Sequence, residues 1–211
     1  MIEIGVSIPN IVLSPRRRQA LGATLGQDCI AKMGHLLDQS AQEDRALVLD
    51  LTGVTDINGS FLKATVFWAL QCGQADVRRA ASANSAPWAI RPLKLFPVVT
   101  GCSGEVIDEI ADFFSGRNLP IMHLEKAASG TRVTRRILGT LDPVLDRTLS
   151  GLISLGEGTA ADLAARSDET ISINGWNNRL ADLHLLRLAT RKRQGKFFFY
   201  KSTADAISLW D

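Results

Sequence analysis

The apolar run at residues 46–51 constrains the fold most, because only Asp50 interrupts it. A short continuous apolar run is typical of a central strand that is covered on both faces. Similar runs alternate along the chain with segments whose apolar residues recur at helical spacing. The pattern predicts strands at 1–8, 11–13, 93–100 and 120–124, and helices at 16–38, 60–71 and 105–114. Strands that alternate with helices predict an α/β sheet with helices packed against it.

Composition excludes several protein classes. The chain has 211 residues, 45% of them hydrophobic and 22% charged, which is enough for one large domain or two small ones. Its longest apolar stretches, such as 64–70, are far shorter than the roughly 18 residues that span a bilayer, so we expect no membrane protein. No basic leader precedes a long apolar segment, so we expect a cytoplasmic protein.

The cysteines and histidines do not indicate catalysis or metal binding. The three cysteines are too far apart for a zinc site or a disulfide framework. No histidine has a cysteine or carboxylate at metal-ligand spacing, and no nucleophile, base and acid arrangement can be read from the sequence order. We therefore expect no metal, no cofactor and no enzymatic activity. These residues are Cys29, Cys72, Cys102, His35, His123 and His184.

Positive charge is concentrated near the carboxyl end. The net charge of the whole chain is only +2, but the segment 171–201 holds seven basic residues and one acidic residue. Such a concentration indicates a polyanionic partner, with a solvated basic surface as the alternative. A stretch of small and basic residues at 127–140 has no sustained apolar period. We therefore predict a first domain at 1–128, a linker at 129–140 and a second domain at 141–211.

A motif in the first domain resembles a known family. Residues 46–62 read Ala-Leu-Val-Leu-Asp-Leu-Thr-Gly-Val-Thr-Asp-Ile-Asn-Gly-Ser-Phe-Leu. This segment resembles the central strand, loop and helix start of the STAS domain, the module of anti-sigma-factor antagonists. It is most similar to the STAS-like variant in which a Ser-Phe pair opens the helix, and the order of elements over 1–126 agrees. The resemblance implies an α/β domain that senses a signal or recruits a protein partner.

The same resemblance makes Ser60 a candidate regulatory site. STAS antagonists carry Asp-Ser-Ser-Gly in this loop, and a partner kinase phosphorylates the second serine. The aligned residues here are Asn58, Gly59, Ser60 and Phe61, so Ser60 falls on the phosphorylated position although two neighbours differ. The alternative is that Ser60 caps the helix by accepting a hydrogen bond from a backbone N–H.

The second domain shows three helices and a basic hairpin. A helix from Asp142 ends at two glycines, 156 and 158. A second helix, 160–166, begins with the capping-box sequence Thr159 to Asp162. A third helix, 171–185, is expected to pack one apolar stripe inward: Ile173, Trp176, Leu180 and Leu183. Residues 187–201 then predict two strands joined by a Gln-Gly turn.

This order of elements over 141–203 resembles the winged helix-turn-helix domains of MarR-like and ArsR-like bacterial regulators. Asparagine side chains can make bidentate contacts to adenine in the major groove, and basic residues on the hairpin neutralise phosphates or enter the minor groove. The candidate DNA-binding residues are Ser172, Asn174, Asn177, Asn178, Arg179, Arg191, Lys192, Arg193 and Lys196.

Structural interpretations of these residues stay open. The asparagines could form a solvated helix face, and the basic residues could protect the edge of the hairpin against pairing. Phe197, Phe198 and Phe199 could make an exposed aromatic contact, but we expect alternating burial against the helices. The terminal residues 202–210 could be a packing helix or part of a dimer contact.

The sequence therefore predicts a two-domain regulator that binds double-stranded DNA. Because one winged module makes a modest interface, we expect a homodimer. The alternative is a protein–protein adaptor of a partner-switching pathway, regulated by phosphorylation and without direct DNA binding.

Overall fold

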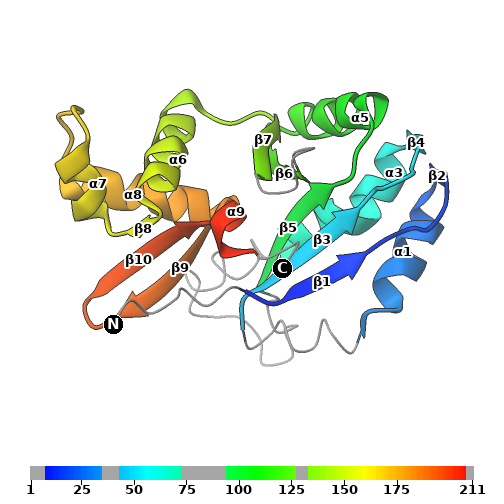
Figure 1. Ribbon diagram of the computed structural model, residues 1–211, viewed down its shortest axis with the longest axis horizontal. Coiled ribbons are helices and arrows are strands. Elements are labelled where there is room, and N and C mark those ends of the chain that lie inside the picture. Colours follow the sequence, from blue (N-terminus) through cyan, green and yellow to red (C-terminus); the bar gives the residue numbers. More distant parts are fainter. Residues whose placement is uncertain (1–7, 35–42, 73–93, 127–132, 208–211) are drawn as a thin grey trace, which may run out of the picture.

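The structure, a computed structural model, describes residues 8–34, 43–72, 94–126 and 133–207 (Figure 1). These ranges form a mixed α/β structure around a five-stranded sheet, so the predicted α/β class is confirmed for the first part of the chain. The strand order is β1-β3-β5-β6-β7; the first four strands are parallel, and β7 runs antiparallel to β6. The strands are β1 (Asn10–Leu13), β3 (Arg45–Asp50), β5 (Leu95–Thr100), β6 (Pro120–Lys126) and β7 (Val133–Gly139).

Helices cover one face of this sheet and lie to its right in Figure 1. Alternate strand residues such as Leu47, Leu49 and Val99 point into that layer and are fully buried there. The helix predicted at 60–71 runs from Gly59 to residue 72 and includes a π-helical turn. The elements of the layer are α1 (Ala23–Ala31), α3 (Gly59–Leu62), η1 (Lys63–Phe67) and α5 (Gly104–Ser115).

The prediction of a helix at 16–38 is wrong at its start. The segment before α1 instead forms a short strand, β2 (Gln19–Ala20), which pairs in parallel with β4 (Asp56–Ile57). The helix begins only after Gly22, whose φ of +86° is a conformation that L residues rarely adopt. Most of the strand predicted at 1–8 lies outside the described residues.

The range expected as a linker contains strand β7. It pairs with β6 along its whole length, from Lys126 opposite Val133 to Pro120 opposite Gly139. Its outer residues, including Arg135 and Arg136, are exposed, because β7 is the last strand at its edge of the sheet. A basic edge strand therefore has the composition that resembled a linker.

The C-terminal segment, defined here as residues 142–207, follows the predicted order of helices and hairpin. Asp142 caps the first helix, Gly156 ends it, and the capping box of Thr159 and Asp162 is present. A short strand between the first two helices joins the hairpin to make a three-stranded sheet in the order β8-β10-β9. The elements are α6 (Pro143–Leu155), β8 (Glu157–Gly158), α7 (Ala160–Arg166), α8 (Ile173–Leu185), β9 (Ala189–Gln194), β10 (Phe197–Ser202) and α9 (Thr203–Ala206).

This segment packs against the second face of the five-stranded sheet. Ala46, Val48 and Val98 on that face share a buried apolar cluster with residues of α6 and α8. An ion pair between Arg135 of β7 and Asp205 of α9 lies at the same junction. Ala204 and Ala206 are buried, so this part of the predicted terminal helix is a packing element. Within the described ranges, no helix is long and apolar enough to cross a membrane.

Candidate nucleic-acid interface

Helix α8 presents three predicted contact residues on one exposed surface. Trp176, Leu180 and Leu183 are buried, as expected for the inward stripe. Since 100° separates successive residues, the asparagines project from the other side of the helix. All three are exposed to solvent: Asn174, Asn177 and Asn178. The helix therefore offers amide groups, which can both donate and accept hydrogen bonds, to an external partner.

At the start of α8, the predicted burial of Ile173 is wrong, and Ser172 has a structural role beside its predicted DNA contact, which stays a prediction. Ile173 does not join the buried stripe, because it is the first helical residue and 46% of its surface is exposed. It lies beside Asn174 and adds an apolar group suited to a thymine methyl. Ser172 is the N-cap, and its hydroxyl accepts a hydrogen bond of 3.2 Å from the backbone N–H of Gly175. The Ser172 hydroxyl thus fixes the start of the helix.

Arg179 is engaged within the protein. Its Nη1 donates to a carboxylate oxygen of Glu169 at 2.5 Å, and its guanidinium lies 5.0 Å from the centre of the Trp176 ring. This hydrogen bond lowers the pKa of the Glu169 carboxyl. Arg147 of α6 reaches the other oxygen of the same carboxylate at 3.5 Å. Arg179 therefore ties α8 to the preceding loop and to α6, rather than extending toward a partner.

The hairpin of β9 and β10 carries the other predicted residues. Its strands pair from Ala189 opposite Ser202 to Gln194 opposite Phe197, and Gly195 turns the chain with φ of +62°. The distal half, from Arg191 to Phe198, is exposed throughout. Four cations project from this half: Arg191, Lys192, Arg193 and Lys196. No carboxylate occurs between residues 183 and 204, so no acidic side chain within the hairpin offsets its positive charge.

Two aromatic residues accompany these cations. The expected alternating burial of the phenylalanines is wrong, because Phe197 is 64% exposed and Phe198 is 40% exposed. The guanidinium of Arg191 lies 4.6 Å from the centre of the Phe198 ring. Only Tyr200, farther from the turn, is fully buried. The tip of the hairpin, up to Phe198, extends beyond the neighbouring helices (Figure 1), so no helix covers it.

His184 fixes the hairpin relative to α8 and to the large sheet. Its Nδ1–H donates to the carbonyl oxygen of Ala189 at 2.9 Å, where β9 begins. Its ring lies 5.9 Å from the Phe96 ring of β5. Burial lowers the pKa of His184 to about 4, so the ring is neutral at pH 7. The asparagine surface and the basic hairpin are thus held in one arrangement.

Ser60 lies outside this surface, on the opposite layer of the sheet. It is exposed and lines a pocket of about 690 Å³ between α1 and α3, which also includes Lys63 and Trp68. The alternative in which Ser60 caps the helix is wrong. Asn58 is the N-cap of α3, and its side-chain oxygen accepts a hydrogen bond of 3.0 Å from the N–H of Phe61.

Comparisons with known proteins do not assign this chain to a family. No protein-family model matches it, and a search of the curated proteins finds no match. In the described parts of the chain, no group of three or more His, Cys, Asp and Glu side chains could hold a metal ion.

Proposed function

We propose that this chain is a DNA-binding regulator whose C-terminal segment grips an operator as a winged helix-turn-helix domain. The observation that carries the proposal is the combined surface of α8 and the β9–β10 hairpin. Three exposed asparagines lie on the helix, and four exposed cations lie on a hairpin that contains no carboxylate. In such domains the helix enters the major groove, and the hairpin reaches the neighbouring phosphates or minor groove.

The element order supports this proposal. Strand β8 lies between α6 and α7 and pairs with β10, so the hairpin is anchored to the helical part by main-chain hydrogen bonds. His184 anchors the hairpin a second time through Ala189. A rigidly placed hairpin loses less conformational entropy on binding than a flexible one. We further propose that the protein acts as a homodimer on double-stranded DNA, since one module of this size makes a modest interface.

The first part of the chain is proposed to sense a signal or to recruit a protein, as a STAS-like domain would. Ser60 is exposed at the start of α3, so a kinase can reach its hydroxyl. A phosphate there adds nearly two negative charges beside Lys63 and changes this surface. Intact-mass measurement after incubation with ATP and candidate kinases tests the modification. An unchanged mass in the wild type, or the same adduct in Ser60→Ala, contradicts it.

DNA titration tests the main proposal. Duplexes are first selected from a random library, and binding of the best duplex is then measured at several salt concentrations. Replacing Arg191, Lys192 and Arg193 by Gln should weaken binding and reduce the salt slope by about 3, because each phosphate contact contributes about 0.9. A matched control removes three exposed cations elsewhere in the triple variant Arg18→Gln, Lys63→Gln and Arg136→Gln. Equal losses in both variants would contradict a specific role for the hairpin.

Asparagine variants test sequence recognition separately from affinity. Asn174→Ala, Asn177→Ala and Asn178→Ala should each reduce the preference for the selected duplex over a random one, by about 1–3 kcal/mol where the amide contacts a base. Binding to random DNA should remain, because phosphate contacts dominate it. An unchanged preference in all three variants would contradict base recognition by α8.

A second candidate function is favoured by the exposed phenylalanines. Phe197 and Phe198 give the hairpin tip an aromatic surface, and aromatic residues and arginine are enriched at protein interfaces. In this alternative, the chain is a partner-switching adaptor that binds protein through the same hairpin. Undetectable DNA binding at every salt concentration, with the hairpin intact, would favour the adaptor.

A further inference from the structure

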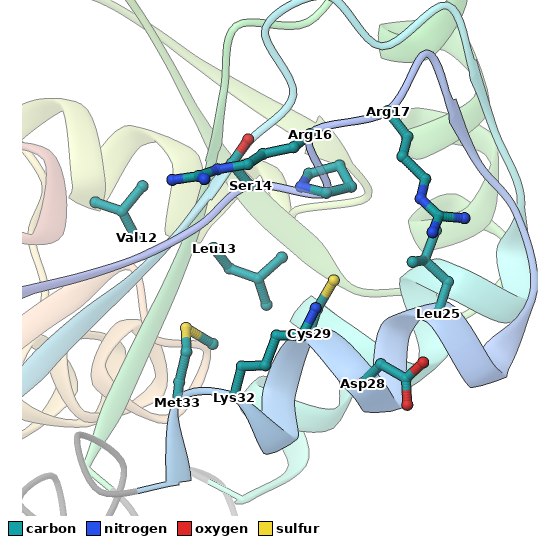
Figure 2. A pocket seen from close by; sticks show the side chains of 11 residues that line it. Val12, Leu13, Ser14, Arg16, Arg17, Leu25, Asp28, Cys29, Lys32 and Met33 are labelled. Atoms are coloured by element: carbon teal, nitrogen blue, oxygen red, sulfur yellow. The ribbon is translucent and has the colours of Figure 1, made fainter.

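A second pocket lies beside β1, the edge strand at the other end of the sheet from β7. Its volume is about 620 Å³, within the range of roughly 300–1,000 Å³ found for small-molecule sites. It is formed by the end of β1, the loop at 14–17 and one side of α1 (Figure 2). None of its lining residues belongs to the C-terminal segment.

Part of the pocket wall is apolar. Leu13 and Met33 are buried members of the core cluster, and Leu25 packs against the same cluster. Val12 lies at the rim, and its side chain, 57% exposed, points away from Leu13 on the other face of the edge strand. Leu25 and Cys29 are only partly buried in the pocket wall, and covering such apolar surface with a ligand is favourable.

Cations line the rest of the pocket. In Figure 2, Arg16 extends over Leu13 and Arg17 descends toward Leu25. Lys32, the C-cap residue of α1, lies beside Cys29. In the part of the chain that the structure describes, no carboxylate forms an ion pair with any of these three cations. Asp28 is the one acidic residue in the lining, so the pocket carries a net positive charge.

The loop that carries the arginines is held in place. The carbonyl oxygen of Arg18 accepts hydrogen bonds from the backbone N–H groups of Thr55 at 2.8 Å and Asp56 at 3.2 Å. It also accepts one from the Thr55 hydroxyl at 3.2 Å. Arg16 has a φ of +50°, a left-handed conformation that is uncommon for a residue with a side chain. Such strain persists where the surrounding structure imposes it, and it is frequent at ligand clamps.

From this juxtaposition we propose that the pocket binds a small amphipathic organic anion. The apolar part of the ligand packs on the partly buried Leu25 and Cys29, above a floor formed by Leu13 and Met33. Its acidic group is bound by Arg16 and Lys32. Burial raises the pKa of the Cys29 thiol, so the thiol stays neutral and contributes to the apolar lining. Binding is therefore reversible and non-covalent. This inference does not depend on DNA binding.

The probe for this site is 8-anilinonaphthalene-1-sulfonate, which joins an aromatic body to a sulfonate. We expect its fluorescence to increase and saturate at one molecule per chain. Octanoate should displace it, and octanol should not, because octanol lacks the charge. If octanol displaced the probe as effectively as octanoate, the proposal would be overturned, because the pocket would then bind apolar molecules without preferring an anion.

Charge-neutral variants locate the site. The double variant Arg16→Gln and Lys32→Gln should weaken probe binding about tenfold or more, because two charge-assisted hydrogen bonds are lost. Both side chains are exposed, so the variant should keep the wild-type melting temperature. The matched control, Arg136→Gln with Arg166→Gln, removes two exposed cations from β7 and α7 and should change binding less than twofold. The same is expected of Phe197→Ser with Phe198→Ser, which removes the exposed aromatic surface of the hairpin.

The outcomes separate the two proposals. If the Arg16 and Lys32 variant bound the probe as tightly as the wild type, the proposed anion site would be overturned, whether or not the protein binds DNA. Loss of probe binding in the phenylalanine variant would place the probe on the hairpin and would also overturn it. A protein that binds the probe as expected but does not bind DNA would keep the pocket and contradict the proposed function.

Discussion

Single side chains decide how the exposed surfaces of this protein are held. His184 illustrates this, because one ring nitrogen bonds to β9 while the ring lies against Phe96 of the large sheet. Asn58 has a similar position in the other layer: its side-chain oxygen accepts from Phe61 at 3.0 Å and from Gly22 at 3.1 Å. One amide thus joins the start of α3 to the start of α1.

His184 should make stability depend on pH. Its pKa is about 4 when folded and near 6.5 when unfolded, so the unfolded chain binds more protons between these values. Stability contributed by the neutral ring is therefore complete above about pH 6.5 and is lost toward pH 4, by up to about 3 kcal/mol. Urea unfolding at pH 7 and pH 4.5 measures this. His184→Gln should reduce the loss, and identical losses in both proteins would contradict it.

The Asn58 cap should matter more to stability than Ser60 does. Asn58→Ala removes an acceptor used by two backbone N–H groups and should lower the free energy of unfolding by about 1–2 kcal/mol. Ser60→Ala, two residues away and exposed, serves as the control and should change it by less than about 0.5 kcal/mol. Urea denaturation compares the two variants. A larger effect at Ser60 would mean that the cap is assigned to the wrong residue.

At the level of elements, the sequence predicts the features that depend on residues close together in the chain, such as the ends of helices. Asp142 and Gly156 mark the ends of α6 in the sequence, and both are found there. Strand β7 was not predicted, because its exposed arginines resemble a linker and its partner is recognised only when the sheet is assembled. The exposure of Phe197 is only an alternative at the level of the sequence, since it depends on how far the hairpin extends past the helices.

The end of β7 offers a test of that assembly. Gly139 has φ of +87°, and a Cβ there would lie 2.2 Å from the carbonyl oxygen of Leu119 and 2.7 Å from Cβ of Phe114. Since backbone must move, Gly139→Ala should cost about 3 kcal/mol or more. Gly53→Ala is the matched control, with φ of +78° and open space, and should cost about 1 kcal/mol. Equal melting temperatures for the two variants would contradict close packing at Gly139.

For the whole molecule, the main question is whether the two parts unfold together. The break in composition at 127–140 predicts two domains, and this division remains a prediction. In the structure the five-stranded sheet is covered on both faces, by α1, α3 and α5 on one side and by the C-terminal segment on the other. Removing the helical layer would expose Leu47 and Leu49 to water, and removing the C-terminal segment would expose Phe96 and Val98. We therefore expect the layers to stabilise each other.

Paired core truncations test this cooperativity. Leu95→Ala removes buried side-chain volume in the helical layer, and Leu152→Ala removes it between α6 and the rest of the C-terminal segment. Each should cost about 2–5 kcal/mol. If the molecule unfolds as one unit, calorimetry shows a single transition that moves to lower temperature in both variants, with equal calorimetric and van't Hoff enthalpies. Two transitions, with each variant moving only one of them, would instead show two independent domains and a sheet face that does not couple them.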